Sequence, residues 1–162
     1  LILTSLQVNQ KINSIAHEIY ENHFEEDELI MICISGNGTE LAKRIMVVLS
    51  EISPLKLQLI ELHINKKEPL KSIETGELRN ANIRGKIVLL VDDVLASGKT
   101  LAYGAKFILD YPVKRLCTAV LVDRKHRLYP IRADYVGLSL ATTLKEHISV
   151  NLNKGKEAVY LD

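Results

Sequence analysis

The chain has 162 residues, of which 21 are Lys or Arg and 20 are Asp or Glu, giving a formal net charge of +1 at pH 7. This balance disfavours a dedicated nucleic-acid-binding protein, which usually carries a clear basic excess. Hydrophobic residues make up 47% and charged residues 25%, close to the average for globular domains and unlike disordered chains. The length predicts one domain over residues 1–162, which buries roughly 70% of the surface that its unfolded chain exposes.

In chain order, apolar residues alternate between helical spacing and short continuous runs. Helical spacing predicts a helix at 12–19, 41–52 and 101–109, and apolar runs predict strands at 29–34, 55–64, 87–91, 116–122 and 135–138. The polar stretch 65–84 is interpreted as a long loop, and loops of that length are usually functional or disordered.

This alternation predicts an α/β fold, with an open, mostly parallel, doubly wound (Rossmann-like) sheet and helices on both faces. Ligands bind such sheets at the carboxyl ends of the strands. The segments to search for a site therefore follow Ile34, Ile64, Val91 and Val122.

The two cysteines, Cys33 and Cys117, each lie in an apolar run typical of a buried strand. We expect two free core thiols and therefore a reducing compartment. No apolar stretch approaches the roughly 18 residues of a membrane span, and the first residues lack the pattern of a signal peptide. The sequence thus predicts a soluble, cytoplasmic protein.

The clearest motif directly follows the strand predicted at 87–91. Two carboxylates, Asp92 and Asp93, precede a loop of small residues and then a helix. Small residues allow backbone N–H groups to turn inward, and the start of a helix favours an anion. Ser97 and Thr100 add hydroxyl donors. The motif therefore predicts a phosphate-binding loop.

A nucleotide-binding P-loop is the commonest alternative, and it needs Gly, four residues and then Gly-Lys-Ser/Thr. Gly98-Lys99-Thr100 matches the end of that pattern, but Asp93 occupies the first Gly position and would repel a polyphosphate. The two carboxylates suit hydroxyl groups better, such as those of a ribose whose 5′-phosphate lies in the loop. The alternative without function is an ordinary strand–turn–helix junction.

The string from Asp92 to Thr100 resembles the signature of type I phosphoribosyltransferases, which bind phosphoribosyl pyrophosphate (PRPP) there. The resemblance implies the fold of that family, with magnesium bridging ribose and pyrophosphate oxygens. It implies that Asp92 and Asp93 hold the ribose 2′- and 3′-hydroxyls, and Asp93 is the expected stabiliser of the cationic ribose. The implied ribose-phosphate site comprises Asp92, Asp93, Val94, Ala96, Ser97, Gly98, Lys99 and Thr100.

A second segment, 120–137, resembles the pyrimidine operon attenuation regulators, which have uracil phosphoribosyltransferase activity and in some cases bind messenger RNA. This resemblance implies uracil as the base, UMP as the product and a homodimer. It also places the nucleobase against Tyr135, Val136 and Gly137, for which a buried strand is the alternative. RNA binding would involve a basic face of His17, Arg124, Arg127 and Arg132.

Two loops depart from the family pattern. The pyrophosphate loop usually carries a Thr-Arg-Gly-like segment, whereas this chain has Ser35, Gly36, Asn37 and Gly38. The mobile loop usually carries a Tyr-Arg-Asp-Asp-like string, whereas here Lys66 and Lys67 supply the positive charge unless they are simply solvated. Lysine lacks the bidentate fork of arginine. Two hypotheses therefore remain open: a magnesium-dependent phosphoribosyltransferase, and a nucleotide-sensing regulator with little turnover.

His63, His126 and His147 show no metal-ligand spacing with the cysteines.

Overall fold

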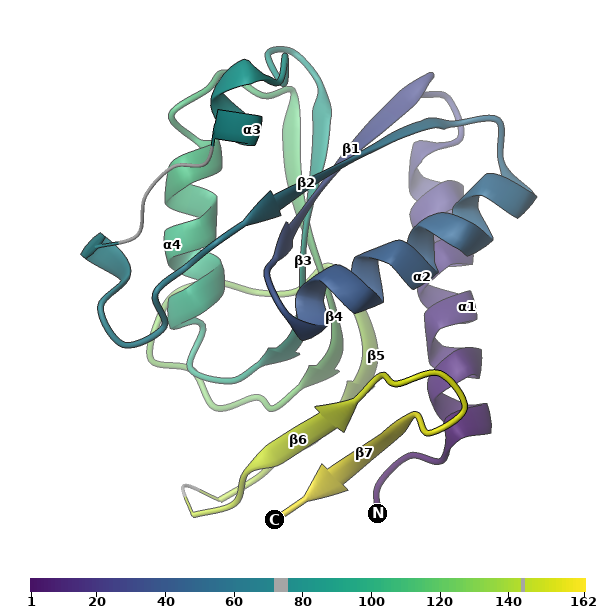
Figure 1. The fold of residues 1–162 in the computed structure, drawn as a ribbon, viewed down its shortest axis with the longest axis vertical. Coiled ribbons are helices and arrows are strands. Elements are labelled where there is room, and N and C mark those ends of the chain that lie inside the picture. The colour runs from purple at the N-terminus through teal and green to yellow at the C-terminus, as the bar shows by residue number, and fades with distance from the viewer. Residues whose placement is uncertain (72–75, 144) are drawn as a thin grey trace.

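The computed structural model describes residues 1–71, 76–143 and 145–162. Within these ranges a five-stranded sheet lies beside a two-stranded hairpin (Figure 1). The strands of the large sheet run in the order β2-β1-β3-β4-β5, and every neighbouring pair is parallel. These strands are β1 (Glu28–Ile34), β2 (Lys56–Leu62), β3 (Ile87–Leu95), β4 (Arg115–Asp123) and β5 (Tyr135–Ser139). The predicted open parallel α/β sheet is confirmed.

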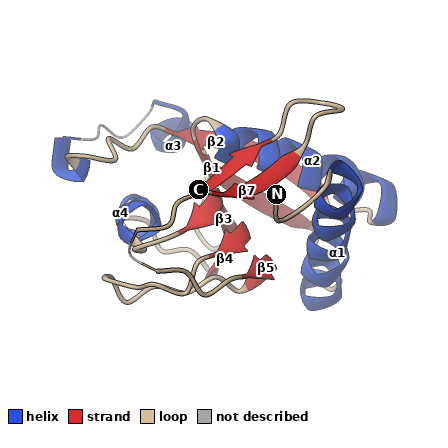
Figure 2. Ribbon diagram, turned by 90° about the horizontal axis from the view of Figure 1, so that it is seen from below, coloured by secondary structure: helices blue, strands red, loops and turns tan. Residues whose placement is uncertain are grey.

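Helices cover both faces of this sheet, as the view along the strands shows (Figure 2). Helices α1 (Ser5–His23) and α2 (Asn37–Ile52) pack on one face, whereas α3 (Gly76–Asn80) and α4 (Lys99–Ile108) lie on the other. Successive side chains of a strand point to opposite faces. In β1, Met31 and Cys33 accordingly join the core under α1 and α2, while Ile32 joins the core under α4.

Strand β3 is longer than the apolar run predicted. It continues through both carboxylates to Leu95, because the last residues of the nine-residue strand β4 still pair with it: Val94 lies opposite Val122, and Leu95 lies opposite Asp123. Asp92 and Asp93 therefore lie on a strand with fixed direction, and the loop begins only at Ala96.

The segment 65–84 is not the continuous loop that the sequence predicts. It contains a short 3-10 helix, η1 (Pro69–Lys71), and helix α3; residues 72–75 lie outside the described part of the chain. Leu78 of α3 is fully buried in the core beside α4. The Glu77 carboxylate accepts a hydrogen bond from the Glu61 amide of β2. Tertiary anchors thus support a helix too short to form alone.

The C-terminal hairpin of β6 (Ile148–Asn151) and β7 (Ala158–Leu161) was not predicted from the sequence. The two strands are antiparallel, and Val159 of β7 also pairs with Leu3 near the N-terminus. The Arg44 guanidinium and the Ser5 hydroxyl, at 2.8 and 2.6 Å, both bind the Glu157 carboxylate. These contacts hold the hairpin beside the carboxyl ends of the large sheet (Figure 1).

Both cysteines are buried and free, as predicted. Among the described residues, no helix combines the length and the apolar character that crossing a membrane requires.

Candidate active site

A cavity of about 410 Å³ lies at the carboxyl end of the central strands. One wall is the whole run from Asp92 to Leu101, at the end of β3 and the start of α4. The other wall is formed by residues 147–150, at the start of the hairpin. Asn37, Lys66 and Arg124 complete the lining. Every residue predicted to hold the ribose phosphate therefore lies on one side of one cavity.

The two carboxylates of the motif occupy different environments. Asp92 is 3% exposed, and its pKa is raised well above the ordinary value, first by burial and then by the charge of Asp93. Asp92 Oδ1 accepts a 2.9 Å hydrogen bond from the Asp93 amide. Asp93 is only half-buried, and its Oδ2 accepts a bond from Asn37 Nδ2 at 3.2 Å. Both residues line the cavity, and Asp93 is the more exposed of the two.

Gly98 shapes the turn of the phosphate-binding loop. It adopts a left-handed conformation, with φ of 89°, immediately before α4 begins at Lys99. A Cβ atom at this position would lie 2.7 Å from Cγ2 of Ile131. Ser97 Oγ accepts a hydrogen bond from the Lys99 amide. The result is a tight turn whose backbone leads directly into the positive end of a helix, an arrangement that binds anions.

The wall formed by residues 147–150, which we call the hairpin wall, was not predicted because its sequence has no recognisable motif. His147 exchanges two backbone hydrogen bonds with Asp162, each 2.8 Å long, and Ser149 Oγ donates to the Asp162 carboxylate at 3.1 Å. Asn37 Nδ2 donates to the carbonyl oxygen of Val150 at 2.9 Å as well as to Asp93. Asn37 thus connects the hairpin wall to Asp93 on the opposite wall of the cavity.

The two loops that differ from the family pattern, predicted as the pyrophosphate loop and the mobile loop, contribute one residue each to the cavity. Asn37 and Gly38 are the first residues of α2, and only Asn37 of the predicted pyrophosphate loop lines the cavity. Gly38 lies against β3, where a Cβ would come within 3.2 Å of Asp92 Oδ1. Lys66 lines the cavity and its charge lowers the pKa of Asp92, opposing the larger effect of burial. Lys67 is exposed and does not belong to the lining.

The structure does not bring Tyr135, Val136 and Gly137 to the cavity. The Tyr135 ring is buried beneath α1, where its hydroxyl lies 3.0 Å from His23 Nε2. Burial, followed by the charge of Arg115, lowers the pKa of His23. A Cβ at Gly137 would lie 2.5 Å from the Leu121 carbonyl oxygen. Packing of β5 against β4 and α1 accounts for the burial of Tyr135 and for the lack of a side chain at Gly137. The base contact of Tyr135, Val136 and Gly137 stays a prediction.

The four residues of the predicted basic face differ in how far their side chains reach solvent. The Arg127 guanidinium is directed into the protein, toward Ala96, Asp123 and Ile131. Arg124 lines the cavity and donates to Thr142. The Arg132 side chain is 89% exposed, and His17 is also exposed. Two of the four residues are therefore engaged in internal contacts.

Residues 2–153 match the family model of the phosphoribosyl transferase domain. The chain belongs to the phosphoribosyltransferase family. It is 36% identical to the bifunctional protein PyrR of Haemophilus ducreyi over 160 residues, covering 93% of this chain and 88% of that protein. It is 35% identical to the bifunctional protein PyrR of Streptomyces coelicolor, covering 99% and 88% of the two chains.

Solved structures of the family share the fold. The hypoxanthine phosphoribosyltransferase of Staphylococcus aureus superposes with a TM-score of 0.76 at 17% identity, covering 89% of this chain and 79% of that one. The hypoxanthine-guanine phosphoribosyltransferase of Bacillus anthracis gives a TM-score of 0.74 at 21% identity, covering 86% and 81%. At this level of identity, the similarity establishes the type I phosphoribosyltransferase fold and not the base.

Proposed function

We propose that this protein transfers ribose 5-phosphate from PRPP to a nucleobase and releases pyrophosphate, with uracil as the base and UMP as the product. The observation that carries the proposal is the cavity itself. The run from Asp92 to Leu101 forms one of its walls without interruption, and its resemblance to the PRPP-binding signature of the family to which the chain belongs supports the proposal.

The walls of the cavity suit the separate parts of PRPP. The turn from Ala96 to Thr100 offers backbone N–H groups, hydroxyl groups and a helix start to the 5′-phosphate. Asp93 reaches the cavity beside that turn and can accept hydrogen bonds from ribose hydroxyls. Its negative charge also opposes the positive charge that develops on the ribose when pyrophosphate leaves. Fixed charges of this kind act without reorganisation, so no covalent nucleophile is required.

The donor set fits magnesium bound through the substrate. Within residues 1–71, 76–143 and 145–162, no group of three or more His, Cys, Asp or Glu side chains is placed to hold a metal ion alone. Mg²⁺ is commonly held by one or two carboxylates together with substrate phosphates, and Asp92 and Asp93 supply two carboxylates here. When bound, the ion would offset the negative charge of the departing pyrophosphate.

Uracil is the proposed base because segment 120–137 resembles the attenuation regulators with uracil phosphoribosyltransferase activity. The two curated relatives named above, both called bifunctional protein PyrR, support the same assignment. The base would occupy the side of the cavity formed by residues 147–150, because the opposite wall is taken by ribose and phosphate. The same relationship supports a homodimer in the cytoplasm, which light scattering and localisation of the native protein would check.

The test is base-dependent release of pyrophosphate. Purified protein is mixed with Mg²⁺, PRPP and, in turn, uracil, cytosine, hypoxanthine, guanine and adenine. We expect release with uracil alone. Release with a purine alone would keep the enzyme class and overturn the pyrimidine assignment, whereas no release with any base would contradict the catalytic proposal.

A second candidate is a PRPP- or nucleotide-sensing regulator with little turnover. It is favoured by Asn37, which stands where the family loop carries arginine and whose amide is already occupied by Asp93 and Val150. Calorimetric binding of PRPP without pyrophosphate release would support it. The substitution Asn37→Arg would then be expected to create turnover. An RNA-binding regulator would also show RNA affinity that falls steeply with salt.

A further inference from the structure

The segment from Arg124 to Ile131 lies directly behind the phosphate-binding loop. Its Arg124 amide donates to the Leu95 carbonyl oxygen at 2.9 Å. The amides of Leu128 and Tyr129 both donate to the Ser97 carbonyl oxygen, at 2.9 and 3.0 Å. We call residues 124–131 the backing segment. Of its residues, only Arg124 also lines the cavity.

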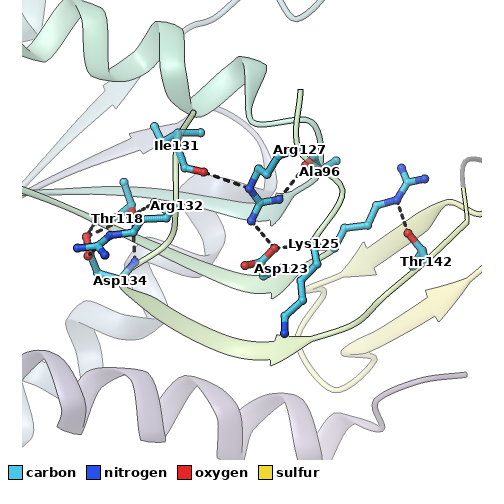
Figure 3. A network of polar contacts seen from close by, with 10 residues as sticks. Ala96, Thr118, Asp123, Lys125, Arg127, Ile131, Arg132, Asp134 and Thr142 are labelled. Carbon is cyan, nitrogen blue, oxygen red and sulfur yellow. Dashed lines mark hydrogen bonds and ion pairs between the residues drawn. The ribbon is translucent and has the colours of Figure 1, made fainter. Parts of the chain in front are cut away.

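Arg127 is the residue of the backing segment whose side chain donates a hydrogen bond to the loop (Figure 3). Its Nη1 donates to the Ala96 carbonyl oxygen at 2.9 Å, and its Nε donates to the Ile131 carbonyl oxygen at 3.1 Å. Its Nη2 forms an ion pair with Asp123 at the end of β4. One guanidinium thus connects the loop, the strand and the far end of the backing segment.

These bonds control the direction of the loop amides. In a trans peptide the C=O of one residue and the N–H of the next point in opposite directions. The carbonyl groups of Leu95, Ala96 and Ser97 are all held toward the backing segment. The amides that follow them, of Ala96, Ser97 and Gly98, are therefore directed away from the backing segment, and these three residues line the cavity. Successive inward amides form an anion-binding concavity.

We propose that Arg127 is a positioning residue for PRPP, which fixes the Ala96 peptide so that its carbonyl oxygen cannot turn toward the 5′-phosphate. This inference rests on the proposed function and deepens it by assigning phosphate affinity to a residue outside the cavity lining. An unrestrained Ala96 peptide can flip and present a negative dipole to the phosphate. Without Arg127, the Ser97 carbonyl oxygen still accepts hydrogen bonds from the amides of Leu128 and Tyr129. Loss of Arg127 therefore releases the Ala96 peptide specifically.

The geometry requires arginine rather than any cation. Three acceptors from three segments surround a planar group whose five N–H donors have fixed directions. Lysine at this position would keep the charge beside Asp123 but could not reach Ala96 and Ile131 together.

The experiment compares Arg127→Met and Arg127→Lys with the unaltered protein in the phosphoribosyl transfer assay, with PRPP binding measured by calorimetry. We expect the KM and Kd for PRPP to rise by about 10- to 100-fold in Arg127→Met, the size of losing one hydrogen bond to a charged group. Arg127→Lys is expected to recover less than half of that loss on a logarithmic scale. The KM for uracil is expected to change by less than about threefold, because a peptide flip at Ala96 affects the phosphate alone.

The matched control is Lys125→Gln, which removes one positive charge from the same segment at an exposed side chain; it is expected to leave both KM values unchanged. Equal increases in both KM values for Arg127→Met would show general misfolding and overturn the proposal, as would full PRPP affinity in that variant. If Arg127→Met does not fold, the Arg127→Lys protein decides by the same two KM values. Failure of the unaltered protein to bind PRPP would instead contradict the proposed function.

Discussion

The two walls of the cavity are built in different ways. The wall from Asp92 to Leu101 is one continuous stretch of chain, backed by β4 and the segment that follows it. The hairpin wall at 147–150 is held in place by residues far away in sequence: Leu3, Ser5, Asn37 and Arg44. The first wall carries the contiguous motif that we propose binds PRPP. The second leaves room for differences in base and in regulation, because its residues can change without altering the motif.

The largest expected difference between the two walls is in their contribution to kcat. Asp93→Asn removes the charge that opposes the cationic ribose, so we expect kcat for pyrophosphate release to fall by about 10²- to 10³-fold. On the hairpin wall, Ser149→Ala removes a hydroxyl already bonded to Asp162, and we expect kcat to fall by less than about tenfold. Similar losses in steady-state assays of the two variants would contradict the division between the walls.

The next comparison uses two glycines with positive φ, Gly98 at 89° and Gly155 at 79°. An alanine at either position costs about 1–3 kcal/mol of unfolding free energy through backbone strain. Gly98→Ala also introduces a Cβ that would lie 2.7 Å from Ile131, whereas nothing lies within 4 Å of that position at Gly155.

We therefore expect Gly98→Ala to weaken PRPP binding at least about tenfold in calorimetry, in line with losing about one charge-assisted hydrogen bond. Gly155→Ala is expected to lose stability alone, measured by urea unfolding. Equal PRPP affinity in the two variants would argue that the loop turn does not determine phosphate binding.

Sequence reasoning succeeded where the necessary information is contiguous. Buried parallel strands are apolar runs, and the residues from Asp92 to Thr100 occupy neighbouring positions, so both could be predicted. The hairpin was not predictable in this way because β6 and β7 have four residues each and owe their position to partners such as Leu3. The contact of the Tyr135 hydroxyl with α1 was not predictable for a related reason. A burial partner from α1, His23, determines its orientation, and no local pattern reveals that contact.

A smaller effect is expected on the stability of the wall from Asp92 to Leu101. The raised pKa of Asp92 means that its charged form is disfavoured in the folded protein. The associated stability is fully present below the ordinary pKa of 3.8 and is lost as the pH rises through the raised value. Asp92→Asn remains neutral, so we expect a higher melting temperature than that of the unaltered protein at pH 7. The difference should shrink toward pH 4, and calorimetric scans across this range would show it. A difference that does not vary with pH would contradict the assignment.

The smallest effect concerns the hairpin wall and has the opposite sign. Hydrogen bonds from Ser5 and Arg44 lower the pKa of Glu157 from 4.5 to about 2. Their stabilisation is present above pH 4.5 and is lost as the pH falls toward about 2. Glu157→Gln is therefore expected to melt at a lower temperature than the unaltered protein at pH 7, and at nearly the same temperature near pH 2. An unchanged melting temperature at pH 7 would show that this contact does not hold the hairpin.

Binding of PRPP to the wall from Asp92 to Leu101 is tested most directly by ¹H–¹⁵N NMR, which suits a chain of 18.2 kDa. PRPP and Mg²⁺ are added to the labelled protein, and the shifts of the backbone amides are followed. We expect the largest shifts at Ala96, Ser97, Gly98 and Thr100, with smaller ones at residues 147–150. Saturable binding whose largest shifts lie elsewhere, or no shifts at these amides, would contradict this expectation.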